Sequence, residues 1–95
     1  MAINIEIIKS KTKEHFVYYT YQFSLPVDPH KNKAGKLRYK LKLVSGDVMI
    51  DKRTGHVHII KLAEGDNGAY IQMAASVLKK HLEKGELPDK TCWAS

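Results

Sequence analysis

A two-residue alternation within residues 15–25 constrains this chain more than any other feature of its sequence. One phase carries Val17, Tyr19, Tyr21, Phe23 and Leu25. The other phase includes Thr20, Gln22 and Ser24. Successive side chains of a β-strand point to opposite faces of a sheet, so the pattern predicts a strand with one buried face.

Weaker signals flank this strand on both sides. Ile3, Ile5 and Ile7 alternate with polar residues and predict a first strand. The polar residues 10–14 indicate a turn. Pro26 and Pro29 lack the N–H group that a sheet ladder uses, so we expect residues 26–35 to form a loop.

A second long alternation covers residues 36–43. We expect its apolar members to face the core, and these are Leu37, Tyr39, Leu41 and Leu43. We expect its cations to face outward, and these are Lys36, Arg38, Lys40 and Lys42. The apolar phase then moves to even positions at Val48 and Ile50. That change requires a two-residue turn or a bulge within residues 45–47, and we favour the turn.

Residues 51–56 predict a β-hairpin. Asp51 is suited to accept local N–H bonds, and Gly55 can supply a positive φ. If Asp51 pairs with His56, two apolar pairs fall on the core face: Ile50 with Val57, and Val48 with Ile59. The same register leaves four residues together on the other face: Asp47, Met49, His56 and His58.

The last part of the chain predicts a helix and a tail. Asp66 or Asn67 can accept from the first N–H groups of the helix, and Gly85 is expected to follow its last turn. The apolar stripe at helical spacing consists of Tyr70, Met73, Ala74, Val77, Leu78 and Leu82. In the tail, Trp93 either folds back onto the core, which we favour, or anchors a partner.

These elements predict an α+β fold, an antiparallel meander sheet of four to five strands with one C-terminal helix packed on one face. Residues 1–95 form a single domain, because a chain of this length supports one hydrophobic core. No apolar stretch approaches the roughly 20 residues that span a bilayer, and no secretory leader is visible. The lone Cys92 cannot form an internal disulfide, so we expect a cytoplasmic protein.

A basic surface on the exposed sheet face is the main functional signal. The formal net charge of +6 favours encounters with anionic partners. Lys36, Arg38, Lys40 and Lys42 form a cationic stripe, and Phe16 and Tyr18 lie on the outward phase of the neighbouring strand. We therefore expect a small intracellular binding module that engages an acidic protein partner. One alternative is single-stranded nucleic acid on the same face, with bases stacked on the aromatic rings. A stripe of ordinary solvent-facing lysines would give the same pattern.

Enzymatic signals are weak. The chain has no phosphate-binding glycine loop, no Gly-x-Ser-x-Gly and no His-Glu-x-x-His motif. His56 and His58 supply half of a metal site, which leaves a metal-dependent enzyme as a further alternative. We expect a non-enzymatic protein with no cofactor and no bound metal. Outward apolar residues also make a sheet-to-sheet homodimer plausible, and these are Phe16, Tyr18, Met49 and Ile60. The sequence identifies neither the partner nor the biological process.

Overall fold

The fold was obtained as a computed structural model, which describes residues 4–31, 35 and 37–94. Side chains are described for residues 4–26, 35 and 40–94, so Ile3 and Lys36 lie outside the described residues, as do the side chains of Leu37, Arg38 and Tyr39. In chain order the elements are β1 (Asn4–Lys13), β2 (Phe16–Lys31), β3 (Leu37–Asp51), β4 (His56–Lys61), α1 (Ala69–Glu83) and β5 (Lys90–Ala94).

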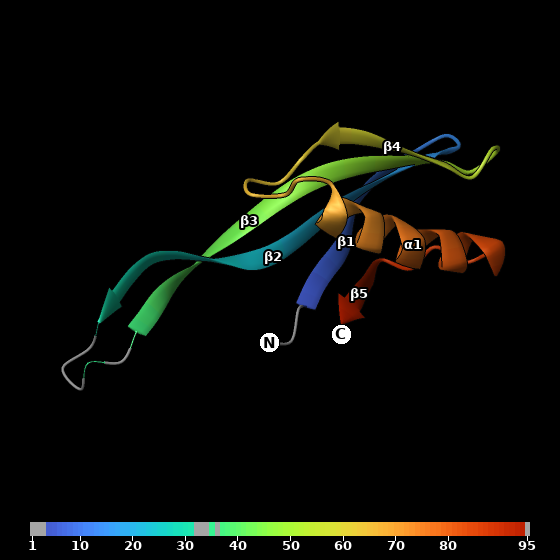
Figure 1. Ribbon diagram of the computed structural model, residues 1–95. Coiled ribbons are helices and arrows are strands. Elements are labelled where there is room, and N and C mark those ends of the chain that lie inside the picture. Colours follow the sequence, from blue (N-terminus) through green and yellow to red (C-terminus); the bar gives the residue numbers. More distant parts are fainter. Residues whose placement is uncertain (1–3, 32–34, 36, 95) are drawn as a thin grey trace.

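The strands form one antiparallel sheet in the order β4-β3-β2-β1-β5. The first four strands are a meander. The chain then leaves the β4 edge, passes through α1 across one face, and returns as β5 beside β1 (Figure 1). We call the uncovered sheet surface opposite α1 the open face. This arrangement confirms the expected α+β fold.

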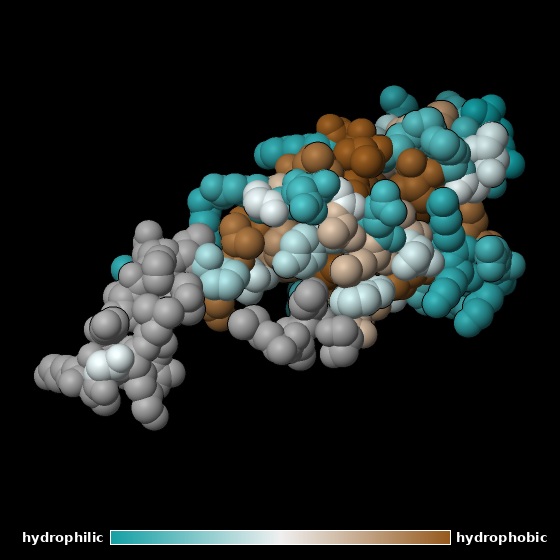
Figure 2. Space-filling view, in the orientation of Figure 1, coloured by the Kyte–Doolittle hydropathy of each residue, from teal (hydrophilic) through white to brown (hydrophobic). Residues whose placement is uncertain are grey.

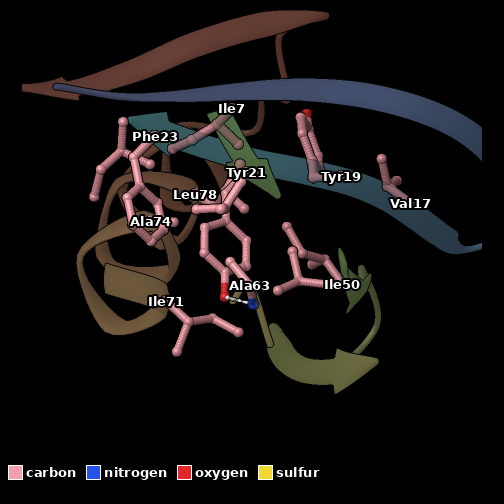
Figure 3. Close-up of a cluster of buried hydrophobic side chains, with 13 residues drawn as sticks. Ile7, Val17, Tyr19, Tyr21, Phe23, Ile50, Ala63, Ile71, Ala74 and Leu78 are labelled. Carbon is pink, nitrogen blue, oxygen red and sulfur yellow. Dashed lines mark hydrogen bonds between the residues drawn. The ribbon is translucent and has the colours of Figure 1, made fainter. Parts of the chain in front are cut away.

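The hydrophobic core lies between the sheet and α1 (Figure 3). The alternation of β2 is confirmed, because Val17, Tyr19, Tyr21 and Phe23 are all buried. The other strands and the helix complete the core with Ile5, Ile7, Val44, Val48, Ile50, Ala63, Ile71, Ala74 and Leu78. Trp93 packs against this cluster from β5, where it pairs with Ile5. The tail therefore folds back, as we favoured, and adds a strand.

The turn expected at residues 45–47 is wrong, because β3 continues through them in unbroken register with β2. The register between β3 and β4 does shift between Asp47 and Val48, but the extra residue there is Ile60 of β4. Val44 and Val48 face the core, so the odd-numbered Leu41 and Leu43 face the opposite side and are 71% and 64% exposed. Our assignment of these two leucines to the core is therefore wrong. For Leu41 the reason is that β2 and β3 extend beyond the part of the sheet that α1 covers (Figure 1). Where no second layer exists, alternation no longer reports which face is buried.

The loop expected at residues 26–35 begins later, because β2 continues to Lys31. The last β2 residue paired with β1 is Gln22, opposite Glu6, so beyond it β2 pairs only with β3. Proline is tolerated where one edge of a strand is unpaired or where a bulge interrupts the ladder. Pro26 lies in the edge segment, and Pro29 lies within the register shift between Val27 and His30.

The turn expected at residues 10–14 is also misplaced. β1 continues to Lys13, and its register with β2 shifts between Lys9 and Lys11. The chain reverses at Glu14 and His15, where Glu14 has a positive φ of 56°. The polar sequence therefore marks a bulged strand followed by a tight turn.

The β3–β4 hairpin has the expected register, with Asp51 opposite His56 and Val48 opposite Ile59. The Arg53 amide donates to Asp51 Oδ1 at 2.9 Å, and Gly55 has a φ of 75°. The helix is also confirmed. Gly85 follows it with a φ of 76°. Within the described residues no helix is long and apolar enough to cross a membrane.

Candidate binding surface

Four of the six residues expected to form the binding surface have described side chains, and these four do not lie on one surface. Phe16 and Tyr18 lie on the open face, as predicted from the alternation of β2. Lys42 has the same strand phase as the buried Val44 and therefore points to the α1 side, where its ammonium pairs with Glu64 at 2.7 Å. Lys40 shares this phase, and both lysines are exposed. Their predicted place on the open face is wrong.

The two groups are also far apart along the sheet. Lys42 pairs with Leu25, and Tyr18 pairs with Met49. The separation from Tyr18 to Leu25 along β2 is about 23 Å at roughly 3.3 Å per residue. The predictions for Lys36 and Arg38 fall outside the described residues, because the structure describes neither Lys36 nor the Arg38 side chain.

Other cations accompany Phe16 and Tyr18 on the open face. The strand registers align two rows across four strands. One row consists of Lys11, Tyr18, Met49 and His58. The second row, next to the hairpin turns, consists of Lys13, Phe16, Asp51 and His56. We call these eight residues, together with Lys52 and Arg53 of the β3–β4 turn, the hairpin-end patch.

Cations of this patch lie over its aromatic rings. The Lys11 Nζ is 4.6 Å from the centroid of Tyr18, and the Arg53 Cζ is 5.7 Å from that of Phe16. These distances are typical of cation–π contacts, which hold a charged group above a ring. The His15 ring lies beside Phe16 at 4.3 Å between centroids. The positive charge is thus displayed on a rigid strand framework.

The acidic side chains of the open face are engaged by their own neighbours. Arg53 contacts both oxygens of Asp51, at 3.2 Å and 3.1 Å, and this lowers the pKa of the Asp51 carboxyl. Asp51 in turn raises the pKa of Arg53. Asp47 accepts a 2.9 Å hydrogen bond from the Thr20 hydroxyl. Among the described residues, Lys11, Lys13 and Lys52 have no ion-pair partner, so the patch is positive.

His56 and His58 lie together on the open face, as predicted, with ring centroids 4.5 Å apart. A catalytic zinc site needs a third protein ligand. Asp51 is bound by Arg53, and the side chains of residues 4–26, 35 and 40–94 include no group of three His, Cys, Asp or Glu that could hold a metal ion. The geometry therefore adds nothing to the metal-dependent alternative.

Sequence reasoning missed Lys11, Lys13 and Arg53 because it placed the two lysines in a turn and considered Arg53 only as part of a loop. One signal could have found the lysines. They are two residues apart, as are Phe16 and Tyr18, so a tight turn after Lys13 would pair both lysines with the two rings.

No family model matches the chain, and neither a curated protein nor a solved structure matches it.

Proposed function

We propose that this chain is a small non-enzymatic binding module that engages an acidic segment of a partner protein on the hairpin-end patch. The observation that carries this proposal is the pair of cation–π contacts, Lys11 over Tyr18 and Arg53 over Phe16, on a sheet face with no covering layer. Fixed cations beside unpaired lysines favour carboxylates and accelerate their capture.

The same contacts favour an acidic protein over single-stranded nucleic acid. Base stacking uses the open face of an aromatic ring, and here cations lie over both rings. Binding of bases would first displace them. Nucleic acid on this patch stays the alternative, since lysines beside aromatic residues also suit a phosphate backbone.

A sheet-to-sheet homodimer is less compatible with this surface. Such a dimer would bring two hairpin-end patches together, and each chain carries a formal net charge of +6. Like charges in one interface oppose association. We therefore propose that a single copy binds its partner, and that it does so in the cytoplasm, where the exposed thiol of Cys92 would stay reduced.

Charge removal on the patch tests the proposal. The variant Lys11→Gln/Lys13→Gln/Lys52→Gln removes three exposed charges. A matched control, Lys40→Gln/Lys42→Gln/Lys80→Gln, removes three exposed charges elsewhere. The probes are fluorescent polyglutamate and a fluorescent oligothymidylate of equal charge. Fluorescence anisotropy measures the binding of each probe at low and at physiological salt.

We expect the patch variant to bind polyglutamate about tenfold more weakly than the natural chain, while the control changes little. Equal losses in both variants would mean that only net charge matters and would refute a defined site. Tighter binding of oligothymidylate, with a steep dependence on salt that the patch variant reduces, would assign the surface to nucleic acid.

A further inference from the structure

The β4 strand is an edge of the sheet, and it pairs regularly with β3 from His56 to Ile59, before a register shift that leaves Ile60 without a partner. In the described part of the chain it pairs with β3 on one side only, whereas its other side has no neighbouring strand. Edge strands carry a row of unpaired N–H and C=O groups that can pair with another chain. β4 also exposes two large apolar side chains, since Ile59 and Ile60 are 58% and 53% exposed.

A groove runs between this edge and the helix. α1 contacts β1 and β5 and lies toward that side of the sheet, so it leaves the side chains of β4 partly uncovered. The groove has a volume of about 390 Å³ and is lined by Val57, Ile59, Ile71, Gln72, Ala75, Ser76 and Lys79. Hydrophobic side chains gather over β4 at this side of the molecule (Figure 2).

We infer that β4 accepts an extended segment of a partner protein as a sixth strand, with alternate side chains of that segment inserted into the groove. Strand addition uses two features in combination, main-chain hydrogen bonds along an open edge and pockets for every second side chain. Val57 and Ile59 are spaced by two residues and face the groove. A paired strand would therefore project apolar side chains at the same spacing, about 6.8 Å, between β4 and α1.

The charge around the groove selects the occupant. Lys79 lines its helical wall, and none of the lining residues is acidic. A second copy pairing through the same edge would bring together two chains that each carry a formal net charge of +6. The complementary occupant is a segment of a different protein. Every second residue of this segment is apolar, and one of its residues carries a carboxylate that would lie near Lys79. This site is separate from the hairpin-end patch and does not depend on it.

Selection from a phage-displayed library of random peptides of about eight residues, long enough to cover β4, tests the inference. The full chain is the immobilised target. The enriched peptide is then synthesised, and its binding is measured by calorimetry and by amide hydrogen exchange of the chain. Ala75→Trp fills the groove, and Lys79→Glu reverses the charge of an exposed wall residue without altering the core.

We expect enriched sequences to alternate apolar residues with other residues and to include Asp or Glu. Binding should protect alternate amides of β4 from exchange. Ala75→Trp and Lys79→Glu should each weaken it by about tenfold or more. The variant Lys11→Gln/Lys13→Gln/Lys52→Gln should bind the peptide as the natural chain does, which separates this site from the proposed function.

Three outcomes would overturn the inference. One is that no peptide is enriched, or that the enriched peptides do not alternate apolar with other residues. Another is binding that neither groove variant weakens or that leaves β4 exchange unchanged. The third is a dimer of the free chain in sedimentation analysis that Ala75→Trp dissociates, since the groove would then belong to a second copy.

Discussion

The hydroxyl of Tyr21 donates a 2.7 Å hydrogen bond to Oδ2 of Asp66 and accepts one of 2.9 Å from the Ala63 amide. Figure 3 shows Tyr21 reaching from β2 to Ala63. The Asp66 carboxylate also accepts from the amides of Gly68, Tyr70 and Ile71, at 2.8, 3.2 and 3.1 Å. A single tyrosine in the middle of the sheet thus fixes the carboxylate that caps α1.

Replacing Tyr21 by Phe tests this network. The substitution keeps the buried ring but leaves the Ala63 amide without its acceptor and Asp66 without one donor. We expect the free energy of unfolding to fall by about 1–3 kcal/mol, the typical cost of an unsatisfied buried polar group. Urea denaturation followed by circular dichroism measures it. Tyr70→Phe is the matched control, because the ring of Tyr70 stacks on Phe23 at 4.0 Å and its hydroxyl bonds no other described residue. Equal effects of the two substitutions would contradict the assigned role.

Alkaline pH should destabilise the fold through two tyrosines. Burial raises the pKa of both Tyr19 and Tyr21 to about 12 from the usual 10.0, and the acidic Asp89 and Asp66 add to the respective shifts. The sign follows from linkage: the phenols ionise in the unfolded chain before they ionise in the folded one. Their stabilising contribution is therefore complete below about pH 10 and is lost as the pH rises toward about 12.

In that window the free energy of unfolding should decrease by roughly 1.4 kcal/mol per pH unit for each tyrosine. Urea midpoints measured between about pH 10 and about pH 12 give the slope. Tyr19→Phe should halve it, because Tyr19 and Tyr21 contribute separately. A slope that this variant leaves unchanged would show that other groups cause the alkaline loss.

The sequence predicts this fold well wherever two layers meet. The core face of β2 and the helix that Asp66 caps follow from periodicity and capping, because the sheet and the helix bury each other. The pairing of Asp51 with His56 follows from turn chemistry. The face of β3 at Leu41 could not be predicted, since that part of the strand lies beyond the buried pair of Phe23 and Val44, and the apolar phase there does not mark the core.

The candidate surface was predictable only in part, for a related reason. The outward position of Phe16 and Tyr18 follows from the alternation of β2. The alternation of Ile5 and Ile7 alone would put Lys11 on the core face. The register shift after Lys9 moves Lys11 to the open face, and in the sequence only a tight turn after Lys13 would indicate this. Bulges change the face that a side chain occupies, and polar segments permit them at several positions. The lysines of the patch therefore required the strand register.

The orientation of β3 gives a direct test by substitution. Leu43 is 64% exposed, whereas its neighbour Val44 is 6% exposed. We expect Leu43→Ser to change the free energy of unfolding by less than about 0.5 kcal/mol, because it lies outside the core. Val44→Ser should lower it by about 2 kcal/mol or more, since it removes buried methyl groups and buries a hydroxyl. Thermal and urea unfolding of both variants measure the difference. The reverse order of effects would restore the register expected from the sequence.

Gly46 should be the least replaceable residue of β3. A Cβ atom at this position would lie 2.6 Å from the Lys61 carbonyl oxygen, 2.6 Å from Tyr21 Cε1 and 2.7 Å from the Ala63 amide nitrogen. Two of these atoms belong to the backbone, and Ala63 is held by the Tyr21 hydroxyl, so the contacts cannot relax by rotation of one side chain. We expect Gly46→Ala to lower the free energy of unfolding by about 3 kcal/mol, at the upper end for overpacking.

Gly85→Ala is the matched control for Gly46→Ala. Gly85 has a φ of 76° and no atom within 4 Å of the added Cβ, so its replacement measures the conformational cost alone, about 1 kcal/mol. The steric origin of the Gly46 effect also predicts coupling. Combined with Tyr21→Phe, which releases the Ala63 amide, Gly46→Ala should cost less than the sum of the two single changes. Strict additivity in this double-mutant cycle, measured by urea denaturation, would show that Tyr21 does not hold Ala63 against the glycine.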